Sequence, residues 1–397
     1  MKKKLLKKIK VLVAMSGGVD SSLVAALLVK QGYDVTGAFI KNWSDTKDLQ
    51  TGECEWRQER RDAIRVAASL GIPFLTFDFE KQYRKLVVDE LFRGYKAGVT
   101  PNPDVLCNEY IKFGLFWSKA KQLGFDLMAT GHYAVNDRTT YNVQRTASLA
   151  PSVIARNVVI KRQSSSVSSS RAHLFRGVDK DKDQSYFLYR INQEVLAHTL
   201  FPLGNYTKSQ VRALAKKMSL PVAEKPDSQG ICFIGKVDFG KFLAKKIKSK
   251  PGDIVTPEGK VIGQHQGLHN YTIGQRHKIK VADKHAWFVA EKDVSANKLV
   301  VVPSDDHPLL KTKRLILTDL HWIAGAAPKI PLDILVQARY RQSPEAGCVK
   351  SIKSGKLEIV LKKPIKSVAP GQSAVLYKGK ECVGGGIISN STTLRTL

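Results

Sequence analysis

One stretch near the N-terminus limits the possible folds more than any other. Residues 11–24 read VLVAMSGGVDSSLV: an apolar run (Val11–Met15), a turn with two glycines, and a second apolar run that begins at Leu23 with helical spacing. This order predicts a buried strand, a tight turn and a buried helix. Because glycine adopts backbone angles closed to other residues, Gly17 and Gly18 can turn successive N–H groups inward at the positive end of the helix. The stretch therefore predicts a phosphate-binding loop.

The loop differs from the common nucleotide-binding motif G-x-x-x-x-G-K-S/T. That motif requires a lysine where this chain has Val19, Asp20 and Ser21. An aspartate beside phosphates is repulsive unless a cation lies between them, which makes Asp20 a candidate Mg²⁺ ligand. The alternative is a plain turn in which Ser16 or Asp20 caps the helix.

The first half of the chain alternates between strand and helix patterns. We expect strands at residues 34–40, 72–79 and 125–129, and helices at residues 55–70, 81–96 and 109–122. Right-handed crossovers would join these strands into a parallel sheet, which binds ligands at the carboxyl ends of its strands. The glycine loop, residues 40–43 and residues 130–133 all emerge at that edge, so we expect the ligand to lie between them; the resemblance of SGGVDS to the loop of the ATP pyrophosphatase superfamily implies that this ligand is the adenosine part of ATP. Taken alone, His132 is more typical of an ordinary core or surface histidine.

Two cysteines lie in unusual surroundings. Cys107 ends the proline-rich stretch GVTPNPDVLC, which favours a loop, and a helix is expected from about Glu109. Cys107 would then precede a helix N-terminus, where the dipole favours a thiolate, although a small buried apolar role is the alternative. Cys232 follows a glycine in KPDSQGICFIG, a placement that suits either an exposed reactive thiol or a strand.

Composition narrows the class of protein and its partners. Five cysteines without a CxxC pair predict neither a disulfide framework nor a zinc site. No apolar segment is long enough to span a bilayer, and the basic N-terminus runs straight into a strand, which predicts a cytoplasmic protein without a membrane partner. The 64 Lys and Arg residues against 35 Asp and Glu give a formal charge of +29. This excess favours a nucleic-acid partner over a merely basic surface.

The C-terminal part has a different pattern. From about Gly252 short strands alternate with Gly, Pro and Asp turns, which predicts an all-β barrel. Residues 271–277, 339–341 and 371–372 combine cations, aromatic rings and amides, as nucleic-acid surfaces do. Residues 141–171 contain a serine-rich run without hydrophobic periodicity and predict a flexible insertion.

Nine segments together resemble one enzyme family. In chain order they read SGGVDSS, FIKNW, TPNPDVLCN, TGHYA, KDQSYFLY, DSQGICFIG, GLHNYTIGQR, ARYR and PGQSAVLY, over nearly the whole chain. The ordered set closely resembles the bacterial tRNA-uridine 2-sulfurtransferases, or tRNA-specific 2-thiouridylases, of the ATP pyrophosphatase (PP-loop) superfamily. This chain departs from the family in two ways: Ile40 replaces a common methionine near the adenine, and the serine-rich insertion is longer than usual.

The resemblance implies an α/β fold with three domains. Residues 1–205 would form a parallel-sheet PP-loop ATP pyrophosphatase domain for adenylation, with the flexible insertion 141–171. Residues 206–285 would form a small central tRNA-binding domain that carries the second cysteine. Residues 286–397 would form a C-terminal β-barrel domain.

The resemblance also implies the reaction. ATP and Mg²⁺ would be used to adenylate the C2 oxygen of the wobble uridine (position 34) of tRNA, because that oxygen is otherwise a poor leaving group. Cys232 would carry sulfur as a persulfide and Cys107 would be the nucleophile, leaving a Cys107–Cys232 disulfide to be reduced. The expected tRNAs are the lysine, glutamate and glutamine acceptors, and the expected sulfur donor is a cysteine desulfurase or a sulfur relay protein.

Family positions further imply which residues contact the substrates. The residues that match ATP contacts are Ala14, Met15, Ser16, Gly17, Gly18, Val19, Asp20, Ser21, Ile40 and Gly131. The residues that match contacts with tRNA or its target base are Asn102, Pro103, Asp104, His132, Lys182, Asp183, Gln184, Arg339, Tyr340 and Gln372. Asp104 is in addition a candidate catalytic acid or base near the uracil.

Two other functions are consistent with parts of the pattern. Another adenylating ligase or amidotransferase with the same loop would use ammonia or an amine, and both cysteines would be dispensable. An RNA-binding protein with a degenerate nucleotide site would bind tRNA without turning over ATP.

Overall fold

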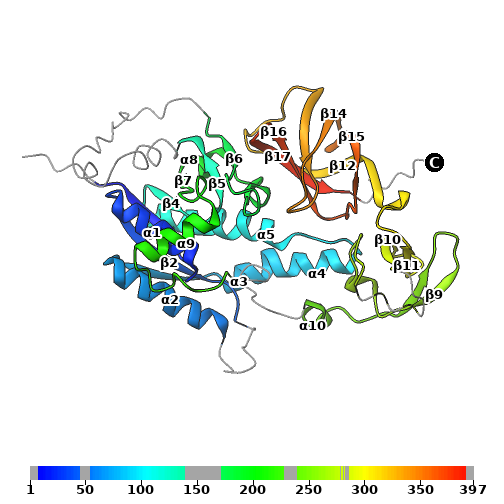
Figure 1. Cartoon of the computed structure of the whole chain (residues 1–397), viewed down its shortest axis with the longest axis horizontal. Coiled ribbons are helices and arrows are strands. Elements are labelled where there is room, and N and C mark those ends of the chain that lie inside the picture. Colours follow the sequence, from blue (N-terminus) through cyan, green and yellow to red (C-terminus); the bar gives the residue numbers. More distant parts are fainter. Residues whose placement is uncertain are drawn as a thin grey trace, which may run out of the picture.

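The computed structural model describes residues 8–44, 54–138, 171–227, 239–277, 279, 281 and 286–389. The predicted insertion 141–171, apart from its last residue, and Cys232 fall outside these residues. The molecule is elongated, with an α/β part at one end and two β-rich parts at the other (Figure 1). No helix in the described parts of the chain is long and apolar enough to cross a membrane.

A parallel sheet forms the centre of the α/β part. Its strands are β1 (Lys10–Ala14), β2 (Asp34–Lys41), β3 (Phe74–Asp78), β4 (Leu127–Ala129) and β7 (Thr199–Leu200). They are ordered β3-β2-β1-β4-β7, and every neighbouring pair is parallel. The predicted parallel α/β fold is therefore confirmed, with β7 as a short strand that the sequence pattern did not reveal.

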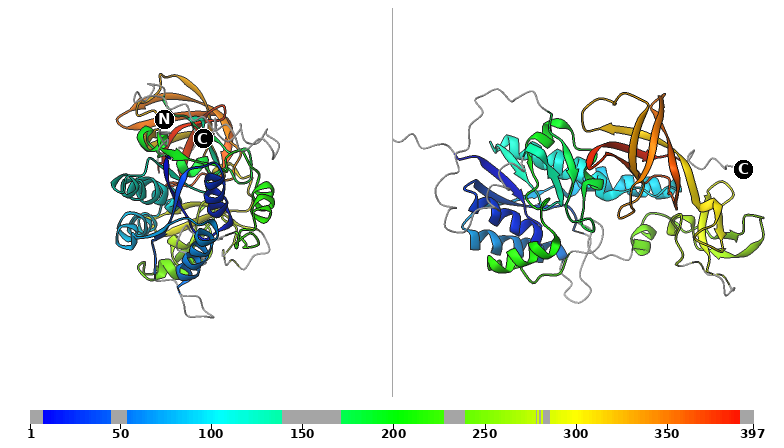
Figure 2. Two further views of the ribbon diagram at one scale, coloured as in Figure 1. Left: turned by 90° about the vertical axis from the view of Figure 1, so that its left-hand side faces the viewer. Right: turned by 45° about the horizontal axis from the view of Figure 1, so that its top comes forward.

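Helices cover both faces of this sheet, which explains why its strands are apolar on both sides. On one face α1 (Val19–Lys30), α2 (Glu55–Leu70) and α9 (Lys208–Lys217) share a hydrophobic cluster with Val11 and Val13 of β1. On the other face Leu12 packs with two longer helical segments. The first comprises α3 (Glu80–Tyr83), η1 (Arg84–Val88) and α4 (Asp89–Lys96); the second comprises α5 (Pro103–Leu106), η2 (Cys107–Phe116) and α6 (Trp117–Gln122). Figure 2 shows these helices around the sheet from two further sides.

The second helical segment begins earlier than the sequence pattern predicts. It starts at Pro103, whereas a start near Glu109 was expected, so that prediction is wrong. Asn102 caps the helix by accepting the Val105 N–H at 3.3 Å, and a proline is well tolerated at the first helical position because no N–H bond is needed there. Cys107 lies in the second turn and its N–H bonds to the Pro103 carbonyl. Cys107 therefore lies inside the helix and not ahead of its N-terminus, where the sequence pattern had placed it.

The middle of the chain forms a four-stranded sheet. It contains β8 (Gly252–Val255), β9 (Val261–His265), β10 (Phe288–Asp293) and β11 (Lys298–Val302), ordered β10-β11-β8-β9. The domain boundary predicted after residue 285 falls within this part of the chain, because β11 pairs with β8. The exact boundaries of the three domains stay a prediction.

The C-terminal strands close into an antiparallel barrel, as predicted. They are β12 (Lys311–Trp322), β13 (Leu332–Gln337), β14 (Glu345–Lys353), β15 (Lys356–Lys366), β16 (Ser373–Lys378) and β17 (Glu381–Ile388). Closure occurs because β12 pairs with both β15 and β17. Two strands of the α/β part, β5 (Ala134–Asn136) and β6 (Leu174–Arg176), extend the barrel sheet beyond β17.

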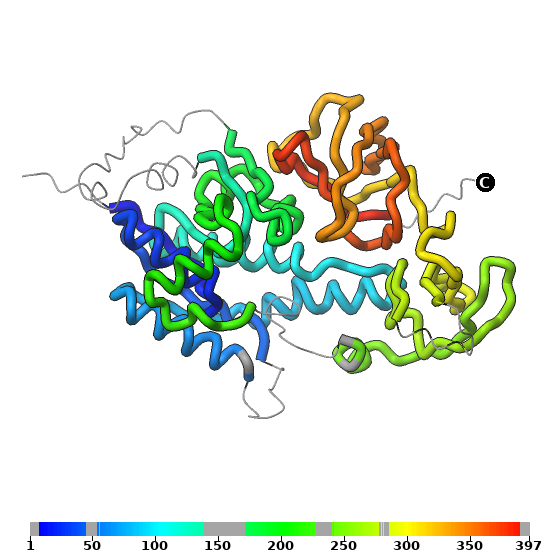
Figure 3. The backbone as a smooth tube through the Cα atoms, viewed as in Figure 1, coloured from blue at the N-terminus to red at the C-terminus, as the bar shows by residue number. Residues whose placement is uncertain are grey.

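Five short helical segments complete the described elements. They are η3 (Ser185–Leu188), α8 (Gln193–Ala197), α10 (Phe239–Ala244), η4 (Leu268–Asn270) and η5 (Pro308–Leu310). Helix α4 runs to the β-rich end of the molecule, where the connection between α4 and α5, residues 97–102, turns and leads back toward the α/β part (Figure 3). There the side-chain amide of Gln372 donates to the Thr100 carbonyl at 2.8 Å. The chain that leads to Cys107 is therefore supported by the barrel.

Candidate active site at the glycine loop

The glycine loop joins β1 to α1. Gly17 has a φ of 74°, and a Cβ atom at this position would lie 2.1 Å from the carbonyl oxygen of Glu59. Only glycine fits there. Gly18 has a φ of −91° and is the N-cap of α1, so its backbone conformation is open to other residues. The expectation that both glycines need special angles is thus confirmed for Gly17 and wrong for Gly18.

The first turn of α1 has no side-chain cap among the described residues. Instead, the hydroxyls of Ser21 and Ser22 donate to the Gly18 carbonyl at 3.3 and 2.8 Å, and the Ser16 N–H donates to the Ser21 hydroxyl at 3.1 Å. The alternative in which Ser16 or Asp20 caps the helix is therefore excluded. A helix start without a side-chain cap, next to a left-handed glycine, suits an anion.

Asp20 contacts two residues from distant parts of the chain. Its Oδ1 accepts hydrogen bonds from the Tyr133 hydroxyl at 2.8 Å and from the Lys208 ammonium at 2.7 Å. Burial and the Asp20 carboxylate raise the pKa of Tyr133, so the phenol stays protonated and donates. A Cβ atom on Gly131 would lie 3.0 Å from the Ser21 N atom, so the turn after β4 packs directly on α1. The glycine loop and residues 130–133 therefore meet, as the sheet topology predicted.

The side chains around the glycine loop show whether the predicted Mg²⁺ could bind there. In the described part of the chain, no group of three or more His, Cys, Asp or Glu side chains could hold a metal ion. Mg²⁺ typically uses one or two carboxylates together with substrate phosphates and water. A single carboxylate, Asp20, beside the predicted phosphate-binding loop fits that type of site, with its side chain 31% exposed.

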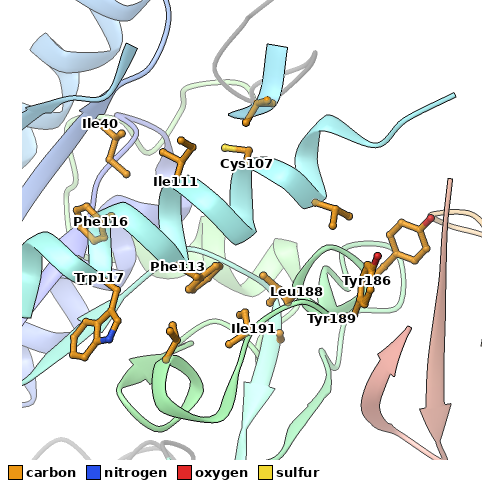
Figure 4. Packing of buried hydrophobic residues seen from close by; sticks show 14 of the residues in the cluster. Ile40, Cys107, Ile111, Phe113, Phe116, Trp117, Tyr186, Leu188, Tyr189 and Ile191 are labelled. Atoms are coloured by element: carbon orange, nitrogen blue, oxygen red, sulfur yellow. The ribbon is translucent and has the colours of Figure 1, made fainter. Parts of the chain in front are cut away.

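Cys107 lies next to the end of β2. Its side chain is fully buried and belongs to the same hydrophobic cluster as Ile40 and Ile111. Figure 4 shows Ile40 from the sheet beside Ile111 and Cys107 from the helix. Ile40 was expected near the adenine, so the thiol and the expected nucleotide edge lie close together.

Asn42 is the most unusual polar residue at this edge. It follows β2 and is only 1% exposed, yet within the described structure neither polar atom of its side chain has a hydrogen-bond partner. A buried amide without partners is costly, and such groups are uncommon outside ligand sites. Asn42 was not singled out from the sequence, although the segment FIKNW that contains it was.

The turn before Cys107 is half-exposed and supported by the barrel. Asn102, Pro103 and Asp104 are all partly accessible. The Gln372 amide, expected to contact tRNA, donates to the carbonyls of the two preceding residues at 2.8 and 3.3 Å. Gln372 therefore positions the turn that was expected to contact the target base.

His132 has the surroundings of a core histidine. It is 7% exposed, accepts or donates one hydrogen bond with the Thr130 hydroxyl at 2.8 Å, and packs between Phe113 and Phe201. Burial, with a contribution from the Lys112 charge, lowers its pKa well below the ordinary value, so the ring is neutral. Its contact with the target base stays a prediction, and the structure favours the core alternative.

The segment 182–184, expected to contact tRNA, is tied to the glycine loop. Gln184 exchanges two hydrogen bonds with the Tyr133 backbone, at 2.9 and 3.0 Å. Asp183 accepts two loop N–H groups at 3.0 and 3.1 Å, and burial raises its pKa. The Lys182 ammonium lies 2.8 Å from Asp227. These side chains hold Tyr133 and its surroundings in place.

A second candidate site lies between the barrel, the four-stranded sheet and the turn before Cys107. It is a cavity of about 510 Å³. Its lining includes Thr100, residues 272–277, Ala338, Arg339, Ser367, Ala369 and Gln372. Arg339 is exposed, and the Tyr340 ring lies 4.4 Å from the Phe187 ring. Three segments expected to form a nucleic-acid surface therefore come together, although they are far apart in the sequence.

Comparison with known proteins identifies the family. Family models match residues 9–236 (tRNA methyl transferase HUP domain), 240–303 (tRNA methyl transferase PRC-barrel domain) and 312–388 (Aminomethyltransferase beta-barrel domain). The tRNA-specific 2-thiouridylase MnmA of Methylobacillus flagellatus is 44% identical over 388 residues, which covers 96% of this chain and 99% of that protein. The enzyme of the same name from Thiobacillus denitrificans is 44% identical over 384 residues, with 96% and 99% coverage.

The chain belongs to the tRNA-specific 2-thiouridylase family. The resemblance carried by the nine sequence segments is thus confirmed, and with it the assignment to an enzyme family, the tRNA-uridine 2-sulfurtransferases. A solved complex of a 4-thiouridine synthetase with RNA and bound ATP matches with a TM-score of 0.32 and 14% identity, over 59% of this chain and 50% of that chain. That likeness is too weak to support a conclusion.

For this 2-thiouridylase family member, sequence reasoning missed the partners of Asp20. Tyr133 was part of a quoted segment, TGHYA, but no role was assigned to it. Lys208 begins an ordinary amphipathic helix and is 188 residues from Asp20. No local signal marks either residue, because only the fold brings them to the loop.

Proposed function

We propose that the protein replaces the C2 oxygen of the wobble uridine (position 34) of tRNA with sulfur, using ATP. The observation that carries this proposal is the position of Cys107, which lies in the same buried cluster as Ile40, at the edge of the sheet where the glycine loop emerges. Membership of the 2-thiouridylase family supports tRNA as the substrate.

ATP would bind at the glycine loop and the neighbouring strand ends. Its phosphates would lie at the start of α1, and its adenosine near Ile40 and Gly131, where the sheet topology leaves strand ends on either side of β1. Asp20 would hold Mg²⁺ together with phosphate oxygens. Bound there, Mg²⁺ would neutralise phosphate charge.

The target base would be activated before sulfur is added. Oxygen at C2 is a poor leaving group, whereas AMP is a good one, so adenylation splits a difficult displacement into two easier steps. The half-exposed turn formed by Asn102, Pro103 and Asp104 would receive the base, which must leave the stacked anticodon loop at a modest cost. The partnerless amide of Asn42 provides a donor and an acceptor at the same edge.

Sulfur transfer would use two thiols. Cys232 would carry a persulfide received from a donor protein, a cysteine desulfurase or a sulfur relay protein, and Cys107 would complete the exchange as nucleophile. The resulting disulfide would then be reduced. The lysine, glutamate and glutamine tRNAs are the expected substrates, and the cytoplasm is the expected location.

The tRNA would lie across the cavity between the barrel and the four-stranded sheet. Arg339 and the neighbouring Arg276 line that cavity, and Tyr340 packs beside it. Arginines and an aromatic ring are the side chains that contact backbone phosphates and unstacked bases.

Nucleoside mass analysis tests this proposal. Unmodified tRNA is incubated with the full-length protein, ATP, Mg²⁺ and a persulfide donor, and its nucleosides are examined for sulfur in place of oxygen. We expect 2-thiouridine with the wild type and with Cys348→Ser, a control in strand β14 of the barrel, and none with Cys107→Ser or Cys232→Ser.

Two results would contradict the proposal. Thiolated product from both Cys107→Ser and Cys232→Ser would exclude the two-thiol chemistry. Tight tRNA binding without any ATP turnover by the wild type would instead favour the RNA-binding alternative.

A further inference from the structure

A lysine from a distant helix enters the glycine loop. Lys208, at the start of α9, places its Nζ 2.7 Å from Asp20 Oδ1 and 2.8 Å from Asp227 Oδ1. Its side chain is 13% exposed. The loop lacks the lysine that the common nucleotide motif contains, and Lys208 supplies an ammonium group at the same loop from elsewhere in the chain.

The fold fixes this ammonium group from several sides. Thr207 caps α9 through a reciprocal capping box, and the Lys208 N–H donates to Asp179 Oδ2 at 2.7 Å. The Nζ atom lies 5.9 Å from the centre of the Tyr133 ring, whose hydroxyl donates to Asp20. A side chain that is already held loses little freedom when it binds a ligand.

Three cations contact the Asp227 carboxylate. Lys182 lies at 2.8 Å, Lys208 at 2.8 Å and Arg212 at 2.6 Å. Burial alone would raise the pKa of Asp227, but the hydrogen bonds from Lys182 and Lys208 hold it at about 2, so it is ionised. Asp20 also pairs with the Lys208 ammonium, and Asp179 accepts the Lys208 N–H, so three cations face three carboxylates here. A phosphate would therefore bind Lys208 in exchange for Asp227 rather than in addition to it.

Lys225, another lysine near the loop, is bound differently. Its Nζ donates to the Gly17 carbonyl at 3.2 Å and to Asp62 at 2.7 Å, and the Asp62 side chain is only 9% exposed. Lys225 therefore has a buried counter-ion and supports the loop backbone. The two carboxylates that hold Lys208 are 31% and 29% exposed, so the ammonium group lies at the open side of the loop.

We propose that Lys208 is a catalytic residue that binds the phosphates of ATP, and that Asp227 is its counter-ion while the nucleotide is absent. This inference rests on the proposed binding of ATP at the glycine loop. When ATP binds, the Lys208 ammonium exchanges Asp227 for phosphate oxygens and keeps its place beside Asp20.

The role of Lys208 follows from the charge that moves during adenylation. The uracil C2 oxygen forms a bond to the α-phosphorus, the bond from that phosphorus to the bridging oxygen breaks, and pyrophosphate leaves with the bonding electron pair. The uracil N3 proton passes to water. Lys208 is placed to balance the negative charge that develops on the departing pyrophosphate.

The test compares two lysines of the same helix in the full-length protein. Lys208→Gln removes the charge at the loop, and Lys208→Arg retains it. Lys216→Gln is the matched control, because Lys216 is 57% exposed and pairs with Glu224 near the far end of α9. Each variant is titrated with Mg–ATP by calorimetry, and tRNA-dependent release of pyrophosphate is measured, together with tRNA affinity and thermal melting.

We expect Lys208→Gln to bind ATP about tenfold more weakly and to release pyrophosphate about a hundredfold more slowly, the size typical of a lost transition-state donor. Lys208→Arg should recover part of the rate, whereas Lys216→Gln should equal the wild type. The affinity for tRNA should stay within about twofold, because the ammonium group contacts ATP.

The Asp227→Asn variant shows whether Lys208 binds ATP or only stabilises the fold through its ion pair with Asp227. If Asp227 competes with the phosphates for Lys208, its removal leaves ATP binding as tight as in the wild type or tighter. If the cluster only stabilises the fold, Asp227→Asn and Lys208→Gln should weaken ATP binding alike, which would overturn the inference. If Lys208→Gln has a lowered melting temperature, the ATP affinities of Asp227→Asn and Lys208→Arg still distinguish a phosphate ligand from a structural ion pair.

Failure of the inference is distinguishable from failure of the proposed function. Wild-type ATP turnover with an unaffected Lys208→Gln variant would overturn the role of Lys208 alone. Absence of ATP binding by the wild type would overturn both.

Discussion

At the scale of single residues, the glycine loop shows what one position can require. The sequence SGG suggested two special glycines, but only Gly17 has a left-handed backbone and a carbonyl oxygen where a side chain would be. That carbonyl belongs to Glu59 in α2, a contact no local pattern could reveal. The loop could therefore be predicted from the sequence, whereas the reason for its first glycine could not.

Gly17→Ala should destabilise the protein more than an alanine at another left-handed glycine. Gly32 has a φ of 86° but nothing within 4 Å of its Cβ position, so Gly32→Ala should cost about 1 kcal/mol from the backbone angle alone. Gly17→Ala adds a clash with backbone, and we expect a loss of about 3 kcal/mol in the free energy of unfolding. Urea denaturation measures both, and equal losses would show that the loop moves away from Glu59 without cost.

At the scale of elements, helices with a regular apolar spacing were predicted correctly, whereas an irregular helix start and a very short strand were not. The helix at 55–70 was predicted with its observed bounds, because its apolar spacing ends at Gly71. The helix that contains Cys107 begins before the predicted start, because a proline-rich stretch is also a good helix start when asparagine precedes it. β7 contains only two residues and pairs with β4, so it has no periodicity of its own.

Gln372 links two elements in a way that can be tested. Gln372→Ala removes the donor to the Thr100 and Pro101 carbonyls, so the turn that begins at Asn102 should lose its fixed position. We expect the KM for tRNA to rise about tenfold with ATP affinity unchanged, because two hydrogen bonds are lost. Gln264→Ala, an exposed position on β9, is the control. A parallel loss of ATP affinity in Gln372→Ala would contradict this positioning role.

At the scale of the whole molecule, one arginine joins the α/β part to the barrel. Arg190 contacts Glu109 of η2 and, at 3.0 Å, Asp319 of β12. Burial raises the pKa of Glu109, while its hydrogen bond to Arg190 opposes that rise. The helix that carries Cys107 is therefore joined to the barrel through Arg190, by a largely buried pair with Glu109 and a second pair with Asp319, whose side chain is 63% exposed.

Arg190→Met should destabilise the protein by about 3 kcal/mol near neutral pH, because it leaves the buried Glu109 carboxylate without its cation. When folding raises the pKa of a carboxyl group, the protein loses stability as pH rises above the pKa that the group has in the unfolded chain. The variant raises the pKa of Glu109 in the folded protein further. The loss should therefore be smaller at about pH 5 than at about pH 8.

Arg314→Met provides the comparison for Arg190→Met. The Arg314–Glu358 pair is exposed, with 48% of the arginine side chain accessible, and should contribute less than about 1 kcal/mol at either pH. Chemical denaturation of both variants at the two pH values measures the difference. A loss in Arg190→Met that grows toward low pH would contradict the assigned role of Glu109.

Much of the candidate site could be predicted because its segments follow parallel strands. Topology alone brings the glycine loop, Ile40 and residues 130–133 to one edge of the sheet. The charged partners of that site could not be predicted, since Lys208 and Asp227 reach it from a separate helix and loop. Gln184, expected to contact tRNA, also supports Tyr133, and this role could not be predicted because hydrogen bonds between distant parts of the chain leave no local pattern.

The path of the uridine oxygen tests the central claim most directly. A tRNA whose wobble uridine carries oxygen-18 at C2 is thiolated by the full-length protein with ATP, Mg²⁺ and a persulfide donor, and the AMP formed is analysed by mass spectrometry. If the base is adenylated before sulfur displaces AMP, each AMP formed with a thiolated uridine contains the labelled oxygen. Thiolated tRNA accompanied by unlabelled AMP would contradict the account.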